Sequence, residues 1–260
     1  MSDFRFVRLE AADNGVRTVT LDRPPVNALG RDLVEELGST WEHLRGDADA
    51  RCVVVRSAGK HFCGGADLKE RREMTLDDVR AFVPRLAGAV NGLAGLPVPT
   101  IAAVRGAAAG GGCELALACD LRVLAENASI GLRETALAIL PGAGGTQRLP
   151  RLIGPARAKR WIFTARMHSA SDALADGVAD GVVTNDRLDD EVSALAAEIA
   201  ANGPIANRLA KRAIDRGAHL GMDDALALEW ECYQGTIETE DRLEALRAFA
   251  EKRAPNFRGR

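Results

Sequence analysis

The chain has 260 residues, of which 47% are hydrophobic, and this is enough for one large domain or for one domain with a small appendage. A net charge of −3 and an aromatic content of 4% argue against a basic, base-stacking surface for nucleic acid. No apolar run reaches the roughly 18 residues that a membrane helix needs, and the mixed, charged N-terminal stretch lacks the features of a signal peptide, so we expect a cytoplasmic protein.

The first half of the chain alternates strand and helix patterns. Short apolar runs predict strands, and leucine-rich stripes at helical spacing predict amphipathic helices. Pro84 is compatible with the second helix only near its start. Strands that are separated by helices predict a largely parallel sheet with crossover connections. The predicted strands are Val16–Leu21, Cys52–Val55, Pro99–Val104 and Leu121–Ala125, and the predicted helices are Arg31–Leu44, Phe82–Leu93 and Glu114–Cys119.

The second half becomes mostly helical after the glycine-rich segment at residues 140–145. Its helices carry leucine and alanine stripes that require burial against the core or against another subunit. We therefore divide the chain into a core domain, residues 1–200, and a C-terminal helical region, residues 201–260. The predicted helices are Ala156–Phe163, Asp189–Ala201, Ile205–Arg216, Met222–Gln234 and Arg242–Glu251.

Several kinds of chemistry lack the motifs that they need. Five widely spaced cysteines without a CxxC pair, and four histidines without HxxxH spacing, argue against a disulfide framework and against a metal site. The nucleophile elbow GxSxG, the phosphate loop GxxxxGK and a strand-linked GxGxxG are not present, so serine hydrolysis, nucleotide hydrolysis and hydride transfer have no support. We interpret Cys63 and Cys113 as small core residues.

The most informative segment is Gly110-Gly111-Gly112-Cys113-Glu114. Glycines allow a backbone to approach a ligand closely. A helix that begins among them directs free N–H groups, and the positive end of its dipole, at that ligand. Glu114, one turn into the helix, can then act on a ligand whose negative charge those N–H groups hold. This arrangement suits proton chemistry next to a carbonyl.

Five segments, in order along nearly the whole chain, resemble the crotonase (enoyl-CoA hydratase/isomerase) superfamily. The resemblance implies an α/β fold with a spiral ββα core and a helical C-terminal region, which serves trimerisation and covers the CoA site. It also implies a homotrimer or a dimer of trimers. The segments are LDRPPVNAL at 21–29, FCGGADLKE at 62–70, AAVRGAAAGGGCELALACD at 102–120, LRETALAILPGAGGTQRLPRLIG at 132–154 and EALRAFAEKRAPNF at 244–257.

The resemblance assigns an oxyanion hole to two backbone N–H groups, those of Ala66 and Gly111. Attack at the β-carbon of an enoyl thioester moves electrons onto the carbonyl oxygen, and fixed donors that face this oxygen stabilise the developing charge. Without the resemblance, an ordinary tight turn is the better interpretation of the glycines beside Ala66.

The resemblance also assigns a catalytic pair, Glu114 and Glu134. Two carboxylates can share one water molecule, with one taking its proton and the other supplying a proton to the α-carbon. Like charges in an apolar pocket should separate the two pKa values, but the sequence leaves open which glutamate is the acid. Taken alone, Glu134 fits a solvated carboxylate on a helix or loop better than a catalytic group.

CoA contacts are implied for three segments. Pro25-Val26 resembles the loop that lies along pantetheine and adenine, and the turn at 66–69 matches backbone atoms that contact adenine. Lys252 matches a C-terminal lysine that meets CoA phosphate, often from a neighbouring subunit, although Lys69 and Lys252 are also compatible with ordinary surface charge. The predicted CoA-binding residues are Pro25, Val26, Ala66, Asp67, Leu68, Lys69 and Lys252.

We therefore predict an enoyl-CoA hydratase that converts trans-2-enoyl-CoA to 3-hydroxyacyl-CoA, as in β-oxidation of fatty acids. Neither a metal nor a redox cofactor is expected, and CoA arrives as part of the substrate. The alternatives are a methylglutaconyl-CoA hydratase, whose branch the segment at 129–151 resembles and which needs a cation for a distal carboxylate, an enoyl-CoA isomerase, and a non-catalytic acyl-CoA binder. RNA binding, known for one branch, finds no basic cluster, because the arginines at 71, 72, 80 and 85 fit a solvated helical face.

Overall fold

A six-stranded sheet forms the centre of the molecule in the computed structural model, which describes residues 4–260. Its strands are β1 (Val7–Ala11), β2 (Val16–Leu21), β3 (Cys52–Ser57), β4 (Thr100–Val104), β6 (Leu121–Ala125) and β9 (Gly181–Val183). They lie in the order β1-β2-β3-β4-β6-β9, and every neighbouring pair is parallel except β1 with β2. The structure thus has the largely parallel sheet that the alternating pattern predicts.

A second sheet has three short strands, β5 (Ala107–Ala109), β7 (Ser129–Gly131) and β8 (His168–Ser169). β5 and β7 are parallel, and Ala109 pairs with Gly131. β5 follows β4 directly and β7 follows β6 directly, so successive passes of the chain contribute one strand to each sheet. This repeated passage is the spiral α/β architecture that the sequence predicts.

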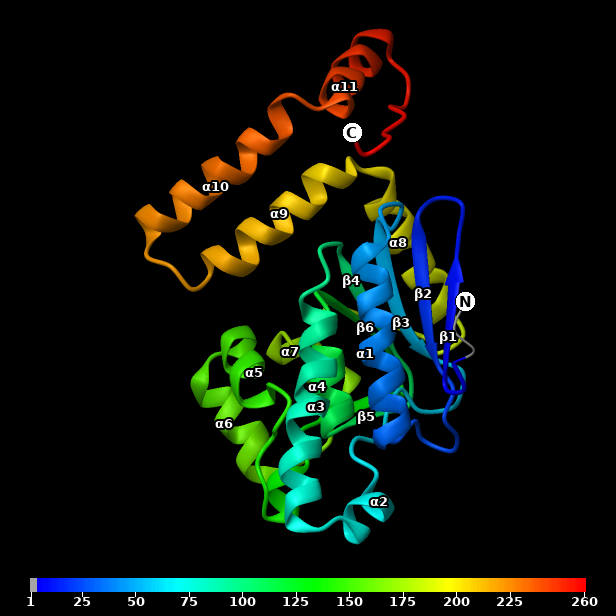
Figure 1. The fold of residues 1–260 in the computed structure, drawn as a ribbon, viewed down its shortest axis with the longest axis vertical. Helices are drawn as coiled ribbons and strands as arrows, with labels where there is room; N and C mark the ends of the chain where they lie inside the picture. Colours follow the sequence, from blue (N-terminus) through cyan, green and yellow to red (C-terminus); the bar gives the residue numbers. More distant parts are fainter. Residues whose placement is uncertain (1–3) are drawn as a thin grey trace.

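Helices cover both faces of the large sheet (Figure 1). α1 (Arg31–Gly46) packs on α3 (Leu76–Ala94), and the apolar stripe of α1 is buried. α8 (Leu188–Ala201) packs against β2, β3, β4 and β6. The remaining helices before α8 are α2 (Leu68–Glu73), α4 (Gly111–Leu117), the 3₁₀ helix η1 (Glu134–Leu137), α5 (Gly145–Ile153), α6 (Pro155–Thr164) and α7 (Ala170–Asp176).

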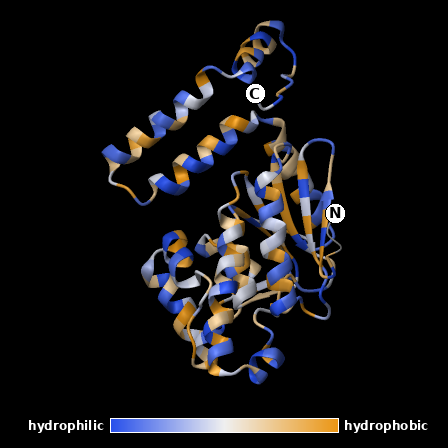
Figure 2. Cartoon of the chain, in the orientation of Figure 1, coloured by the Kyte–Doolittle hydropathy of each residue, from blue (hydrophilic) through white to orange (hydrophobic). Residues whose placement is uncertain are grey.

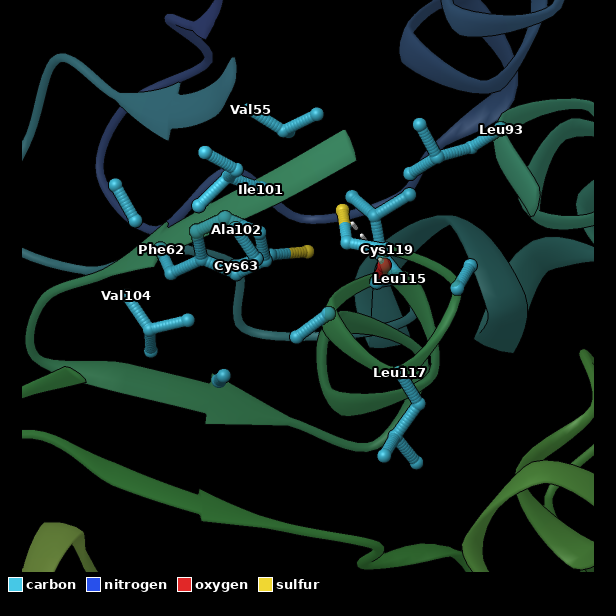
Figure 3. Close-up of a cluster of buried hydrophobic side chains, with 14 of the residues drawn as sticks. Val55, Phe62, Cys63, Leu93, Ile101, Ala102, Val104, Leu115, Leu117 and Cys119 are labelled. Atoms are coloured by element: carbon cyan, nitrogen blue, oxygen red, sulfur yellow. Dashed lines mark hydrogen bonds between the residues drawn. The ribbon is translucent and has the colours of Figure 1, made fainter. Parts of the chain in front are cut away.

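α4 is surrounded by the hydrophobic core, and all seven of its residues are buried. Figure 3 shows Leu115 and Cys119, in α4 and just after it, among side chains of β3 and β4 such as Val55 and Ile101. A helix that is buried on every side needs an apolar sequence, and α4 meets this requirement apart from one residue, Glu114. The fold therefore places a carboxylate inside its core.

The last three helices are α9 (Pro204–Gly217), α10 (Met222–Ile237) and α11 (Glu240–Glu251). α9 and α10 pack as a hairpin that extends away from the sheets (Figure 1). Lys211 of α9 forms an ion pair with Asp120, whose other carboxylate oxygen accepts hydrogen bonds from the N–H and hydroxyl of Thr100 in β4. This contact ties the hairpin to the core.

Two expectations about the elements were wrong. The helix predicted at Phe82–Leu93 begins at Leu76, because Thr75 and Asp78 form a capping box there, and Pro84 therefore lies in its interior with its ring exposed. The Glu114–Cys119 helix runs from Gly111 to Leu117, so Gly110 precedes it and Gly111 and Gly112 are its first two residues. The three-residue strands β5 and β7 are too short to carry a periodic pattern and were not predicted; α5, which buries Gly145, Leu149 and Ile153 at helical spacing, was also not predicted.

Candidate active site

Three parallel segments end side by side at one edge of the small sheet. Cys63 pairs with Ala108 on one side of β5, and Gly131 pairs with Ala109 on the other side. Since the segments run in the same direction, the residues that follow them meet at the same edge. This topology brings together Ala66, the glycines at 110–112 and Glu134, which are far apart in the sequence.

Gly110 lies against the carboxylate of Glu134. Its backbone has φ +53°, a conformation that a residue with a Cβ rarely adopts, and its N–H donates a 2.8 Å hydrogen bond to the carbonyl of Gly131. A Cβ atom at this position would lie 3.0 Å from Oε1 of Glu134. The glycine therefore supplies both the chain reversal and the space for the carboxylate.

The N–H groups of Ala66 and Gly111 are neighbours. A Cβ atom on Gly111 would lie 3.8 Å from the backbone nitrogen of Ala66. Gly111 is the first residue of α4, where an N–H has no intrahelical acceptor. Within residues 4–260, neither N–H donates a hydrogen bond to another protein group. Both N–H groups are therefore without an acceptor in the described part of the chain.

Glu114 is held by two backbone donors. Its Oε1 atom accepts hydrogen bonds of 2.7 Å from the N–H of Ala143 and 2.8 Å from the N–H of Gly145, at the start of α5. Only 2% of Glu114 is exposed. Burial raises the pKa of Glu114, whereas the two N–H groups and the positive charge of Arg148 oppose that rise by stabilising the ionised form.

Glu134 has a different environment, although it too is buried. It begins η1, three residues beyond the end of β7, and no other group among the described residues hydrogen-bonds its Oε2 atom. Burial, and secondly the negative charge of Glu114, raise the pKa of Glu134 to about 7. A carboxyl group in this state is well suited to give up a proton near neutral pH.

The predicted CoA-binding loop and turn are bound to each other. The N–H of Gly64 donates a 2.7 Å hydrogen bond to the carbonyl of Val26. Arg23, which precedes Pro25, forms an ion pair with Asp67 at 2.8 Å, and Asp67 also caps α2. Pro25 is exposed, as are Leu68 and Lys69, so all three are available to a ligand that lies along this surface.

Lys252 is not brought to this group within a single chain. It follows α11, at the opposite end of the molecule from α2 (Figure 1). A CoA contact by Lys252 therefore requires a neighbouring subunit.

The groups that position the two glutamates were not predicted from the sequence. Ala143 and Gly145 bind Glu114 through backbone N–H groups, and Gly110 leaves space for the Glu134 carboxylate because it has no Cβ atom. The turn PGAGG at 141–145 was the one available signal, because several glycines before a helix favour a backbone that binds an anion.

The cysteines near the site are core residues. Cys63 and Cys113 are both fully buried, and burial raises the pKa of Cys63 to about 12 and that of Cys113 well above its usual range.

Between residues 4 and 260, no three His, Cys, Asp or Glu side chains are grouped so as to hold a metal ion, and no helix in this range is long and apolar enough to span a membrane.

Comparison with known proteins agrees with this geometry. Residues 11–260 match the family model for enoyl-CoA hydratase/isomerase. The chain is 47% identical to human enoyl-CoA hydratase domain-containing protein 2, mitochondrial, over 100% of this chain and 91% of that protein. It is 44% identical to human methylglutaconyl-CoA hydratase, mitochondrial, over 99% of this chain and 78% of that protein.

Solved structures show the same fold. The crystal structure of an enoyl-CoA hydratase from Bacillus anthracis has a TM-score of 0.96 and 45% sequence identity, with 98% of this chain and 100% of that chain covered. The chain therefore belongs to the enoyl-CoA hydratase/isomerase family, within the crotonase superfamily that its sequence resembles.

Proposed function

We propose that this protein is a 2-enoyl-CoA hydratase, which adds water across the double bond of a trans-2-enoyl-CoA to give a 3-hydroxyacyl-CoA. The observation that carries the proposal is the meeting of two buried carboxylates, Glu114 and Glu134, with two unpaired N–H groups, Ala66 and Gly111. Hydration of an enoyl thioester requires this combination, because charge develops on the carbonyl oxygen while protons move at the α-carbon and the water.

The environments of the two glutamates support unlike roles. Glu114, with two backbone donors and a nearby cation, is the ionised base, whereas Glu134, with its pKa raised to about 7, is the neutral acid. The water oxygen bonds to the β-carbon as Glu114 takes one of its protons. The electron pair of the double bond moves toward the carbonyl oxygen held by Ala66 and Gly111, and Glu134 delivers its proton to the α-carbon.

This cycle is balanced without a further reactant. The substrate gains one hydroxyl group and one hydrogen, and transfer of a proton from Glu114 to Glu134, directly or through solvent, restores the starting state. No electrons are exchanged with a cofactor, so we expect that neither a metal nor a redox group is needed. Each oxyanion donor should contribute on the order of 3 kcal/mol of transition-state stabilisation.

A second candidate is hydration of 3-methylglutaconyl-CoA. The 44% identity to human methylglutaconyl-CoA hydratase is measured over 99% of this chain, so the matched region includes the candidate site. The substrates differ by a distal carboxylate, and recognition of that group requires a cation beyond the residues placed at the two glutamates.

A direct kinetic comparison tests both functions. Purified protein is assayed with crotonyl-CoA, longer trans-2-enoyl-CoAs and 3-methylglutaconyl-CoA by loss of the enoyl thioester absorbance, and with a 3-enoyl-CoA for isomerisation. We expect the highest kcat/KM with a simple trans-2-enoyl-CoA. A preference for 3-methylglutaconyl-CoA would select the second candidate, and faster isomerisation or binding without turnover would contradict hydration.

We further propose self-association through the C-terminal helices. Large apolar side chains are exposed along α10 and α11, among them Trp230 at 57% and Phe249 at 86%, and Figure 2 shows hydrophobic stretches on these helices. Exposed apolar patches of this kind mark protein interfaces. Assembly into a trimer or a dimer of trimers would cover them and would allow Lys252 of a neighbouring subunit to reach bound CoA. Cytoplasmic localisation stays a prediction, and two of the relatives above carry mitochondrial names.

A further inference from the structure

Arg148 of α5 makes two contacts that link separate parts of the fold. Its Nη1 donates a 2.9 Å hydrogen bond to the carbonyl of Ala143, and its Nη2 donates a 2.6 Å hydrogen bond to Oδ1 of Asn91 in α3. The planar guanidinium holds both acceptors in fixed directions, which an ammonium group does not do equally well. Arg148 therefore fixes the turn before α5 relative to α3.

Ala143 connects this guanidinium to the candidate base. Its carbonyl accepts from Arg148, and its N–H donates at 2.7 Å to Oε1 of Glu114. The second donor to Oε1 is Gly145, two residues further along the same turn. Movement of the turn would therefore displace both donors from Glu114 together.

Gly144 makes room for the guanidinium. Its φ of +108° lies in the left-handed region, and a Cβ atom there would lie only 2.0 Å from Nη1 of Arg148. Any other residue at this position would be strained and would also collide with the arginine. The turn is thus shaped to admit Arg148 while its two N–H groups face Glu114.

The charges around Glu114 come from three elements. Glu134 faces it from η1, Cys113 lies beside it on α4, and Arg148 faces it from α5. The thiol of Cys113 is neutral, because burial raises its pKa well above its usual range. Among the described residues, Arg148 is the cation whose charge opposes the effect of burial on Glu114.

We propose that Arg148 is a positioning residue, which holds the Ala143–Gly145 turn and thereby keeps Glu114 fixed and ionised beside Glu134. The inference rests on the proposed role of Glu114 as the base. Arg148 acts through the turn and through its charge, and it does not itself have to touch the substrate.

The test compares Arg148→Met and Arg148→Lys with Arg151→Met. Arg151 lies one turn further along α5 and is exposed, and its hydrogen bonds within residues 4–260 go to the backbone and side chain of Gln147. Arg148→Met should lower kcat for crotonyl-CoA at least roughly tenfold, with little change in KM, because the base is misplaced. It should also move the acidic limb of the kcat/KM profile upward by at least about half a pH unit, because Glu114 loses its cation.

Arg148→Lys separates charge from geometry. Arg148→Lys should keep the acidic limb of the kcat/KM profile close to that of the wild type but recover only part of the wild-type kcat. Arg151→Met should match the wild type in the acidic limb and in kcat. An unchanged acidic limb in folded Arg148→Met, or an equal shift in Arg151→Met, would overturn the proposal. Should Arg148→Met fail to fold, Asn91→Leu removes the Nη2 acceptor and should lower kcat in the same direction by a smaller factor; an unchanged kcat would contradict the positioning role.

A titration independent of turnover distinguishes this inference from the proposed function. The carboxyl signal of Glu114 is followed by 13C NMR in glutamate-labelled protein and assigned from its loss in Glu114→Gln. In Arg148→Met the midpoint of the Glu114 titration should lie above that of the wild type. In Arg148→Lys it should lie closer to the wild-type midpoint. A wild type that does not hydrate enoyl-CoAs would defeat the function alone, whereas equal Glu114 midpoints in wild type and Arg148→Met would defeat the inference alone.

Discussion

The pKa of Glu134 is raised by burial and then by the negative charge of Glu114, although the two carboxylates are twenty residues apart in the sequence. Their proximity follows from the pairing of β5 with β7, which sets Gly110 beneath Glu134 and starts α4 at Gly111. Their difference follows from hydrogen bonding, since Glu114 accepts two backbone N–H groups and Oε2 of Glu134 has no partner in the described part of the chain. One pair of like residues can therefore serve as base and acid.

Removal of either carboxylate should remove most of the activity. Glu114→Gln and Glu134→Gln keep the size of the side chain but cannot exchange the proton, and each should lower crotonyl-CoA hydration by at least roughly 10²-fold. Binding of a saturated acyl-CoA, measured by calorimetry, serves as the control and should be retained. Near-wild-type turnover in either variant would exclude the two-carboxylate mechanism.

Glu134 should make the stability of the protein depend on pH. Below its ordinary pKa of 4.5 the group is protonated in both the folded and the unfolded chain, and between 4.5 and about 7 only the folded chain keeps the proton. The stability that this provides is complete at low pH and is lost as the pH rises through about 7. The free energy of unfolding of the wild type, relative to Glu134→Gln, should fall by at most about 3 kcal/mol across this range.

Urea denaturation at pH 5, 6, 7 and 8 measures this difference. Glu35→Gln, at an exposed position of α1, is the control for the loss of a carboxylate. A difference that grows in favour of the wild type as the pH rises would show that the folded pKa of Glu134 is lowered instead.

Hydration activity should also depend on the protonated form of Glu134 over the same pH range. With Glu134 as the neutral proton donor, and its pKa raised to about 7, kcat/KM for crotonyl-CoA should decline above pH 7. A pH profile in a buffer series of constant ionic strength provides the measurement. A value of kcat/KM that instead rises through pH 7 would assign Glu134 to the base and reverse the proposed roles.

The long amphipathic elements could be predicted from the sequence, because the spacing of their apolar residues shows which face is buried. The apolar stripe that includes Leu33, Leu37 and Trp41 predicts α1, and all three residues are buried. β5 consists of three alanines, which have no preference for a strand, and it forms because Cys63 and Ile130 flank it with backbone hydrogen bonds. β1, at the edge of the sheet, alternates apolar and charged residues as a half-exposed strand does, but it was not predicted.

The candidate site likewise contains some residues that could be predicted from the sequence and others that could not. Glu114 and the glycines before it carry a chemical signal of their own, whereas Glu134 lies on a single turn and was recognised only from its register in the family pattern. The donors that hold Glu114 are backbone groups, and an N–H has no signature in the sequence. Arg148 acts through Ala143, so its role depends on a contact that only the folded chain contains.

The space at Gly110 should be required for activity more than for folding. Gly110→Ala places a Cβ atom 3.0 Å from Oε1 of Glu134, and hydration should fall at least roughly tenfold because the acid is displaced. Gly177→Ala is the control, since Gly177 also has positive φ but its Cβ would meet nothing within 4 Å. Gly177→Ala should cost about 1 kcal/mol of stability, because Gly177 is in the left-handed helical region, whereas Gly110→Ala should cost up to about 3 kcal/mol, because the φ of +53° and ψ of −122° at Gly110 lie outside that region. Equal activities for the two variants would show that Gly110 serves only the turn.

The ion pair between Lys211 and Asp120 should stabilise the attachment of α9 to the core. The side chain of Lys211 is 9% exposed, and Lys211→Met leaves the partly buried Asp120 carboxylate without its cation. The loss should be on the order of 2 kcal/mol in the free energy of unfolding, whereas Lys159→Met, at an exposed position of α6, should be neutral. A double-mutant cycle with Asp120→Asn measures the coupling, and a coupling free energy near zero would contradict a direct stabilising contact.

The apolar side chains of α10 and α11 should hold copies of the chain together. Trp230 and Tyr233 stack on each other with their ring centroids 5.9 Å apart, and both are more than half exposed, at 57% and 59%. Trp230→Glu places a charge in this surface and should release smaller species, because a buried charge without a partner costs several kcal/mol at an interface. Light scattering coupled to gel filtration measures the mass across a concentration series, and Asp223→Asn, on an exposed position of α10, serves as the control. A wild type that elutes as a monomer at all concentrations would contradict self-association, and an unchanged mass for folded Trp230→Glu would place the interface elsewhere.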